Sequence, residues 1–431
     1  MVVSSYRPAM QADMQRARML SWELPALGWD VEVLTPAASE VRDDILEPDP
    51  AAFFPTAVKV HETGSFMRPV FELLGSRSPA WRTLRPIDQR ARALLKTKRF
   101  DLVYFSTTIF SYFPLGWRWR KMFGVPYVLD FHDPCVQAAT AARPKSLKSR
   151  VSASLDIPIE RAAVVNAAGL VSVSPVYLAA LKQRYGTLNP AWLAPARHAV
   201  IPFGALQSDL TDAGRTARVS SGIASNEIRL HYVGVGSSIM SRSFRALCHA
   251  LALLRRQGHP LVGRVRIRLF GTTYHWKPGD PKVLEDLARE AGIGDLVAES
   301  PERVSYRRSL ELLLESDGAL ILGVDDAGYM PSKLFSYALS GKPLLASLRR
   351  DGPAFAHCLG VPGLAHAIWF EPTGEMPLTE AARIVDVFLQ EAARRQVFDR
   401  RESLKPFLAP AMARRHAELF DACIVPAAVA T

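Results

Sequence analysis

Residues 329–346, YMPSKLFSYALSGKPLLA, are the stretch that decides the fold. Ser332 follows a proline and is a favourable N-cap, so the sequence predicts a short helix over 333–339. Gly341 stands where a helix end favours a left-handed residue, and Pro343 prevents the helix from continuing. The Leu-Leu-Ala that closes the stretch is typical of a strand covered on both faces. Loop, helix, stop and buried strand together indicate an α/β core.

The start of this helix has residue types that suit a phosphate group. Ser332 and Lys333 would bring backbone N–H groups, a hydroxyl and an ammonium to one spot. Ser336 lies one turn after Ser332 and therefore faces the same side of the helix. An ordinary capped helix in an α/β core explains the same residues equally well.

Strands and helices alternate on both sides of this stretch. The expected strands include 31–36, 100–106, 125–134, 170–174, 228–234, 265–271 and 318–323. The expected helices include 14–27, 80–98, 156–168, 242–256, 281–291 and 306–316. This β/α alternation predicts doubly wound α/β sheets, and 431 residues suit two domains.

The run Pro-Ser-Lys-x-Phe-x-Tyr, ending in Gly-Lys-Pro, resembles the donor-nucleotide motif of GT-B glycosyltransferases of the group 1, or family 4, type. The resemblance covers most of the chain as an order of elements, and it is specific in four places. These places are residues 130–134, 200–204, 230–245 and 329–346. The family usually carries two glutamates eight positions apart, and here Gly328 and Ser336 stand in their places.

This resemblance implies two Rossmann-like domains that face each other across a cleft. It also implies transfer of a sugar from a nucleotide diphosphate sugar to an acceptor hydroxyl, with retention at the anomeric carbon. We expect an N-terminal acceptor-side domain, a linker, a nucleotide-sugar-binding domain, and a C-terminal crossover helix with a tail. Their ranges are 1–204, 205–227, 228–405 and 406–431. The chain begins almost inside its first strand, which leaves open a start upstream of Met1.

Polar side chains follow the strand expected at 125–134. Asp130, His132 and Asp133 would lie at a strand carboxyl end, where open sheets bind their ligands. A histidine there can bond a sugar hydroxyl or exchange a proton. His132 is therefore the first candidate for a catalytic residue on the acceptor side, with Asp133 as its orienting or capping neighbour and Asp130 beside it. Aspartates that cap a turn explain the same pattern.

A glycine- and serine-rich turn after the strand 228–234 is a candidate for donor binding. Gly234 and Gly236 give a geometry that suits phosphate. In the family an arginine directly follows the first glycine, and a lysine lies a few residues later. Val235 replaces the arginine, and Arg242 falls where the lysine would be. A cation at a helix start is unfavourable with the helix dipole unless an anion binds there.

Gly271 ends a strand, as does the family's glycine before the loop that binds the base. Tyr274, His275 and Trp276 could stack on a nucleobase, and packing in a core or interface explains them equally well. Asp325 and Asp326 are candidates to replace the missing first acid, or are exposed loop acids.

No metal or separate cofactor is expected, because a nucleotide diphosphate sugar is the co-substrate. Arg242, Lys333 and a helix N-terminus would take the charge of its leaving diphosphate. The acceptor is an unidentified glycan, lipid-linked or small molecule.

The basic charge is concentrated in one part of the chain. Residues 59–150 hold 17 Lys/Arg against 6 Asp/Glu, so they account for the whole net charge of +11. Trp117 and Trp119 are interleaved with basic residues, which suits an anionic membrane surface. A solvated basic face explains the same composition, and nucleic acid is the least favoured partner.

The four cysteines form no metal-binding pattern, so a reducing cytoplasm is the expected location. We expect the protein to lie there, or on the inner face of the membrane as a peripheral protein. Synthesis of cell-surface polysaccharide or glycolipid is the expected process.

Two other functions agree with the sequence. The missing acids favour a GT-B scaffold that binds a ligand or a partner enzyme without catalysis. A nucleotide-sugar epimerase would share the two-domain shape, but it needs more acid and base groups than the sequence offers. Nucleotide binding without turnover would favour the scaffold.

Overall fold

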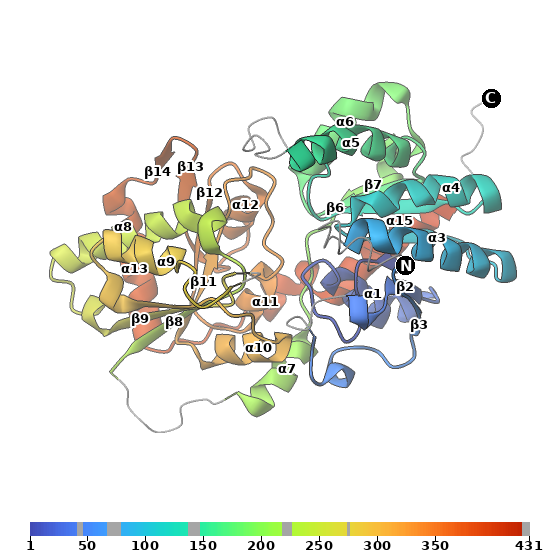
Figure 1. The fold of residues 1–431 in the computed structure, drawn as a ribbon. Coiled ribbons are helices and arrows are strands. Elements are labelled where there is room, and N and C mark those ends of the chain that lie inside the picture. The colour runs from blue at the N-terminus through green and yellow to red at the C-terminus, as the bar shows by residue number, and fades with distance from the viewer. Residues whose placement is uncertain (41–45, 67–78, 137–146, 218–225, 274–275, 425–431) are drawn as a thin grey trace. The chain divides into compact units, whose positions relative to one another are not determined.

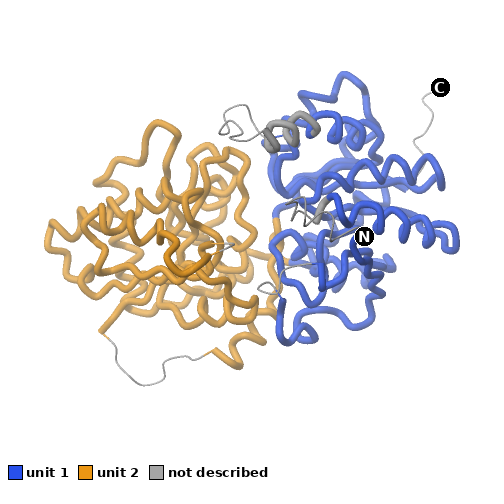
Figure 2. The backbone as a smooth tube through the Cα atoms, in the orientation of Figure 1, with its two compact units in different colours: residues 1–202, 409–431 blue, residues 203–408 orange. Residues whose placement is uncertain are grey.

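The computed structural model describes residues 1–40, 46–66, 79–136, 147–217, 226–273 and 276–424. The chain divides into two compact units (Figure 2). Unit 1 consists of residues 1–202 together with 409–431, and unit 2 consists of residues 203–408. Each unit is an open sheet covered by helices (Figure 1).

Unit 1 has a seven-stranded parallel sheet in the order β3-β2-β1-β4-β5-β6-β7. Its strands are β1 (Val2–Val3), β2 (Glu32–Pro36), β3 (Lys59–Thr63), β4 (Val103–Ser106), β5 (Tyr127–Phe131), β6 (Gly169–Ser172) and β7 (His198–Val200). Its helices are α1 (Gln15–Glu23), α3 (Pro79–Thr97), α4 (Phe113–Phe123), α5 (Leu147–Val164), α6 (Pro175–Tyr185) and α15 (Ala409–Ile424). The strand order reverses between β1 and β4, and ligands of such sheets bind beyond the carboxyl ends at this point.

Unit 2 repeats this plan in the order β10-β9-β8-β11-β12-β13-β14, with only β14 antiparallel. Its strands are β8 (Ile228–Val233), β9 (Val265–Phe270), β10 (Val297–Ser300), β11 (Gly318–Leu322), β12 (Leu344–Arg349), β13 (His366–Glu371) and β14 (Gly374–Glu375). Its helices are α7 (Gln207–Thr216), α8 (Ser241–Arg256), α9 (Val283–Glu290), α10 (Tyr306–Glu315), α11 (Leu334–Leu339), α12 (Pro353–Gly360), α13 (Leu378–Ala393) and α14 (Arg401–Leu404). The order reverses between β8 and β11.

The predicted fold class is confirmed, because both units are Rossmann-like α/β sheets. Every residue of the central strands β5 and β11 is buried, which is why their sequences are almost entirely apolar. The edge strand β3 was not predicted. It has the sequence KVHET with two exposed residues, and among the described residues it pairs only with β2, so it lacks such an apolar run.

The stretch expected to be a linker contains a packed helix. α7 buries Leu210 and Ala213, and the Tyr306 hydroxyl of α10 donates to Asp209 Oδ2 at 2.7 Å. Residues 207–216 therefore belong to unit 2, because their apolar face and one buried carboxylate have partners there. The terminal helix α15 belongs to unit 1, where Arg415 donates to the Val200 carbonyl oxygen at 2.7 Å.

Candidate active site

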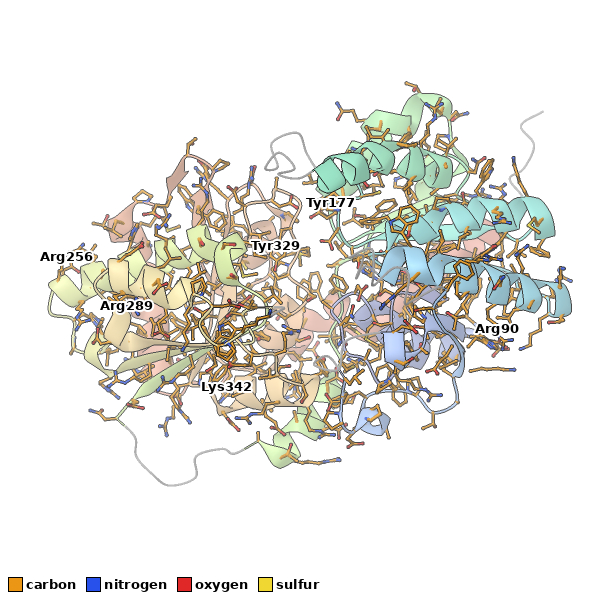
Figure 3. All side chains as sticks on the ribbon, in the orientation of Figure 1. Arg90, Tyr177, Arg256, Arg289, Tyr329 and Lys342 are labelled. Atoms are coloured by element: carbon orange, nitrogen blue, oxygen red, sulfur yellow. The ribbon has the colours of Figure 1, made fainter. Side chains whose placement is uncertain are left out.

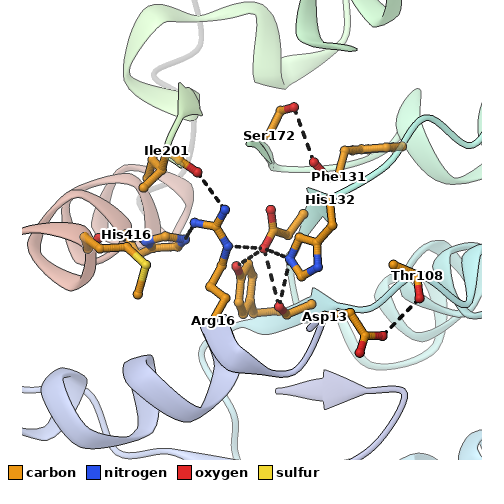
Figure 4. Close-up of polar contacts among 12 residues, drawn as sticks. Asp13, Arg16, Thr108, Phe131, His132, Ser172, Ile201 and His416 are labelled. Carbon is orange, nitrogen blue, oxygen red and sulfur yellow. Dashed lines mark hydrogen bonds and ion pairs between the residues drawn. The ribbon is translucent and has the colours of Figure 1, made fainter. Parts of the chain in front are cut away.

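A buried charged network lies at the carboxyl end of the unit 1 sheet (Figure 4). Arg16 on α1 and Asp130 on β5 are both fully buried, and Arg16 Nε lies 2.8 Å from Asp130 Oδ2. The Tyr104 hydroxyl donates to the same oxygen at 2.7 Å. Arg16 Nη2 also donates to the Ile201 carbonyl oxygen at 2.6 Å. The network therefore ties α1 to β4, to β5 and to the end of β7.

The protonation states in this network follow from its contacts. Burial alone would raise the pKa of Asp130, but Arg16 and His132 outweigh burial and hold this pKa well below its usual range. Burial, with the Arg16 charge, lowers the pKa of His416 on α15 to about 3. His416 Nδ1 lies 2.7 Å from the Met412 carbonyl oxygen, so that nitrogen carries the proton. Nε2 is then the acceptor that faces Arg16 Nη1 at 3.3 Å.

His132 joins this network through one ring nitrogen. Its Nε2 lies 2.6 Å from Asp130 Oδ2 and 3.3 Å from the Ser106 hydroxyl oxygen. Its side chain is 2% exposed, whereas Asp133 is an exposed residue. The carboxylate that orients His132 is therefore Asp130, and the sequence analysis had assigned this role to Asp133. Sequence adjacency was misleading because residues 130 and 132 lie on the same side of the extended chain.

Asp13 is a residue that the sequence analysis missed. It lies at the reversal between β1 and β4, where Oδ2 accepts from the Thr108 hydroxyl at 3.0 Å and from the Ser4 hydroxyl. Its Oδ1 is buried and has no hydrogen-bond donor among the described residues. Only the position of Asp13, after the first strand and before α1, could have indicated it.

In unit 2 the Lys333 ammonium packs against the turn that follows β8. Nζ donates to the Val233 carbonyl oxygen and lies 4.9 Å from the centre of the Tyr232 ring. A Cβ at position 234 would lie 1.8 Å from Nζ, so only glycine leaves room for the ammonium. Burial, assisted by the charge of Arg303, lowers the pKa of Lys333 to about 7. In the part of the chain that the structure describes, Lys333 forms no salt bridge.

The helix after Lys333 differs in part from the prediction. α11 begins at Leu334, and Lys333 occupies the N-cap position in helical conformation without a side-chain cap. Ser332 as the N-cap is therefore wrong, and both Ser332 and Ser336 are half-buried. α11 has only six residues, so we assign no phosphate to its N-terminus. Gly341 does adopt the predicted left-handed conformation, with φ of 76°.

The glycine turn does not offer its N–H groups as predicted. The Gly234 N–H donates to the Phe270 carbonyl oxygen at 2.8 Å, and the Gly236 N–H donates to that of Thr272 at 2.9 Å. These bonds extend the pairing of β8 with β9. Because Gly234 has no side chain, the turn leaves room for the Lys333 ammonium.

Arg242 forms an ion pair with a carboxylate side chain of the same chain. Its Nε lies 3.1 Å from Asp325 Oδ2, and Arg349 Nη1 contacts Asp325 Oδ1 at 3.0 Å. This carboxylate offsets the unfavourable position of Arg242 at the start of α8. Asp325 is therefore an ion-pair partner of two arginines, which removes much of the reason to expect it in place of the missing first acid.

Gly271 adopts a left-handed conformation, with φ of 68°. Its carbonyl oxygen accepts from Arg303 Nη1 at 3.2 Å. Arg303 follows β10 outside any motif, so no sequence pattern indicates it. Tyr274 and His275 lie outside the described residues. Trp276 is half-buried, and its indole N–H has no acceptor within the described ranges.

The basic stretch 59–150 is partly used inside unit 1. Asp88 contacts Arg92 and Arg118, at 3.3 and 3.1 Å, and it accepts from the Trp119 indole at 2.9 Å. Trp119 is 1% exposed and belongs to the core, which corrects its predicted place on a membrane-binding surface. Arg90 on α3 (Figure 3) lies 3.1 Å from His61 Nδ1.

Within the described ranges, no cluster of three His, Cys, Asp or Glu side chains is arranged to hold a metal ion. No helix among the described residues has the length and apolarity needed to cross a bilayer.

The chain was compared with domain families and with solved structures. Residues 14–204 match the glycosyl transferase 4-like domain family. No curated protein matches the chain. Among solved structures, Anabaena HepE in complex with UDP and glucose is similar, with 16% identity, a TM-score of 0.58, and coverage of 97% of this chain and 98% of that one. The N-terminal domain of trehalose-6-phosphate phosphatase from Candida albicans has 11% identity, a TM-score of 0.66, and coverage of 98% and 96%.

A third structure, a UDP-forming trehalose-phosphate synthase from Burkholderia xenovorans, has 11% identity and a TM-score of 0.61, with coverage of 97% of this chain and 98% of that one. These likenesses establish the GT-B fold over nearly the whole chain. The chain therefore has the GT-B fold that the motif at 329–346 predicts, and its N-terminal part is similar to a glycosyl transferase domain family.

Proposed function

We propose that the protein transfers a sugar from a nucleotide diphosphate sugar to an acceptor hydroxyl. The observation that carries this proposal is the Lys333 ammonium, which lies at the strand reversal of unit 2 without a carboxylate partner within the described ranges. An anion at this point would restore the charge that burial disfavours. Anabaena HepE, which shares the fold, has been crystallised with UDP-glucose.

In this proposal Lys333 stabilises the diphosphate as it leaves the sugar. Negative charge develops on the leaving oxygen, and a preorganised cation favours that state over the bound donor. We infer a metal-independent reaction because protein cations can supply this stabilisation. Retention at the anomeric carbon is part of the proposal through the resemblance to family 4, and proton NMR of the product tests it.

His132 is the group that we propose to act on the acceptor. Asp130 holds its Nε2 at 2.6 Å, and Arg16 keeps that carboxylate ionised. A histidine oriented by a carboxylate can accept a proton from a hydroxyl or bond the sugar. The acceptor is a glycan, a lipid-linked glycan or a small molecule, and we propose a role in cell-surface polysaccharide or glycolipid synthesis.

We also infer that unit 1 binds an anionic membrane surface. A cavity of about 600 Å³ at the amino end of its sheet is lined in part by basic and aromatic side chains: Lys96, Lys98, Arg99, Phe100 and Phe123. Met122 is 48% exposed beside it, and Ile424 of the cavity wall is 40% exposed. Cations around apolar side chains suit an anionic lipid interface. Co-sedimentation with phosphatidylglycerol vesicles tests this, and protein that stays in the supernatant at low salt would exclude it.

Calorimetric titration of the protein with UDP, GDP and ADP tests the donor site. We expect one of them to bind, and the matching nucleotide sugars then to be hydrolysed or transferred. If none binds, the proposed donor is wrong. Binding of a nucleotide without turnover of any of its sugars would instead indicate a binding protein on the same fold.

A further inference from the structure

The amino ends of three neighbouring strands in unit 2, β8, β11 and β12, carry charged side chains. Arg229 lies near the start of β8, Asp317 directly precedes β11, and Lys342 stands two residues before β12 (Figure 3). Arg229 donates to both carboxylate oxygens of Asp317, from Nε at 3.1 Å and from Nη2 at 3.0 Å. These groups lie at the opposite end of the strands from Lys333.

A small cavity lies beside this ion pair. Its volume is about 80 Å³. A water molecule in the liquid takes up roughly 30 Å³, so the cavity has room for more than one water. Arg395 after α13 and Glu315 at the end of α10 complete the wall that the strand starts begin. The Arg395 side chain is 46% exposed, so an ion from solvent can reach the cavity.

Lys342 is half-buried and brings a positive charge to the cavity wall. Within the described ranges it forms no salt bridge, whereas Arg229 and Arg395 both contact Asp317. Burial lowers the pKa of Lys342, and the two arginines lower it further, although Asp317 acts in the opposite direction. An anion in the cavity would reduce the repulsion among these cations and favour the ammonium form.

The charges that line the cavity do not balance. Three cations face the carboxylate of Asp317, because Glu315 is paired with Arg308 at 2.8 Å. The C-terminal ends of α10 and α13 add partial negative charge, about half an elementary charge each. About one positive charge therefore remains after the carboxylate and both helix ends are counted. The helix ends alone do not explain why three cations gather here.

Arg395 has a backbone conformation that glycine adopts with less strain. Its φ is 52°, in the left-handed region, directly after the C-cap Arg394 of α13. Its Nε lies 3.3 Å from Asp317 Oδ1, so the guanidinium stands at the cavity wall. A strained residue with a charged and partly exposed side chain agrees better with a ligand-binding role than with packing.

We propose that this cavity binds a phosphate group through Lys342 and Arg395. A guanidinium can hold two phosphate oxygens through parallel N–H groups, and the ammonium can hold a third. Pockets for whole drug-sized ligands have volumes of roughly 300 Å³ or more, so only the phosphate group itself would be enclosed. The ligand is therefore inorganic phosphate or the phosphate monoester of a small molecule. This site does not depend on the proposed function.

Thermal unfolding in sodium phosphate tests the proposal, with sodium chloride at the same ionic strength as the reference. The wild-type melting temperature should rise further in phosphate, because a ligand that binds only the folded protein stabilises it. Calorimetric titration then measures the phosphate affinity, and Lys342→Ala should lower it at least tenfold. Lys333→Ala should keep the phosphate response of the cavity. A response that is lost in Lys333→Ala and kept in Lys342→Ala would overturn the proposal.

Arg395→Gly separates ligand binding from folding. Glycine fits the left-handed conformation, so the phosphate-free variant should be at least as stable as wild type while its phosphate affinity falls. Arg394→Ala is the matched control, because it removes the same charge from the neighbouring exposed position outside the cavity wall. Equal phosphate affinity in these two variants would show that the proposal is wrong, as would equal stabilisation of wild type by phosphate and chloride.

Phenyl phosphate distinguishes the two sources of the phosphate group. Binding of phenyl phosphate as tightly as inorganic phosphate, with the same loss in Lys342→Ala, would support the site and indicate a monoester ligand. Binding of inorganic phosphate alone, with that loss, would support the site and indicate the free ion.

Discussion

The two units have the same strand order, but their charge balance differs at the point where that order reverses. In unit 1, Arg16 and Asp130 are fully buried and neutralise each other, and the neutral His416 completes the contact. In unit 2, Lys333 is half-buried against a carbonyl oxygen and two aromatic rings, with Arg303 nearby. Unit 1 therefore holds a network that is complete without a ligand, whereas unit 2 has positive charge that an anion would neutralise.

A preorganised site and a site with unneutralised charge respond differently to substitution. A complete network keeps His132 in one orientation whether or not an acceptor is present, which lowers the cost of binding. A site with unneutralised charge is destabilising until its ligand arrives, so it couples binding to folding stability. Substitutions in unit 1 should therefore change stability first, and substitutions in unit 2 should change ligand affinity first.

The largest effect is expected from Asp130→Asn. This change leaves the buried Arg16 guanidinium without its counter-charge, which typically costs about 3 to 5 kcal/mol of folding free energy. Urea unfolding followed by circular dichroism measures it. The double variant Arg16→Met with Asp130→Asn should lose less than the two single losses combined, because no lone charge remains. Simple additivity of the two losses would show that the ion pair is not the source of the effect.

Acidification should destabilise unit 1 through His416. Its folded pKa of about 3 lies below the ordinary histidine pKa of about 6.5, so between these values the unfolded chain binds more protons and stability falls as the pH falls. The contribution amounts to about 2 kcal/mol between pH 7 and pH 5. Unfolding free energies of wild type and His416→Gln over this range measure it. Equal pH slopes for both proteins would contradict the prediction.

Lys333→Ala should affect ligand binding before stability. We expect nucleotide affinity to fall at least tenfold, about 1.4 kcal/mol, because a charge-assisted contact with phosphate is lost. The melting temperature of the free protein should not fall, since a buried ammonium without a counter-charge is removed. Unchanged affinity would refute the phosphate role.

Gly234→Ala provides a matched test at the same place. Its Cβ would lie 1.8 Å from Lys333 Nζ, so the ammonium must move although its charge is kept. We expect a loss of affinity comparable with that of Lys333→Ala. Gly258→Ala, at another glycine with positive φ and no atom within 4 Å of the added Cβ, controls for backbone strain. Strain alone would make both glycine variants lose stability and leave nucleotide affinity unchanged.

The smallest effect is expected from Ser336→Glu. The family's glutamate at this place accepts hydrogen bonds from ribose hydroxyls, and a carboxylate accepts them more strongly than a serine hydroxyl does. Nucleotide affinity should therefore rise severalfold, as measured by calorimetry. Ser340→Glu, one turn further along and half-buried, is the control for added charge. A lower affinity for Ser336→Glu would mean that the pocket is shaped for a different contact.

Much of the fold could be read from the sequence because local patterns determine it. Fully buried parallel strands need apolar residues throughout, so β5 and β11 were predictable. β8 and β9 were predictable because apolar residues alternate in them with Arg or His. Gly341 was predictable because a left-handed helix end favours glycine. α7 was missed because a short amphipathic helix in a polar segment gives a weak signal, and β3 was missed because an edge strand needs no apolar run.

The candidate site was only partly predictable. The sequence by itself indicated that His132 and Gly234 follow apolar strands and that Lys333 stands at the start of a helix. Only the tertiary structure decided their partners. Asp130 instead of Asp133 orients His132, His416 reaches Arg16 from 400 residues away, Asp325 occupies Arg242, and Arg303 comes to Lys333. The physical reason is that charge pairing depends on distance in space, and the register of neighbouring strands sets those distances.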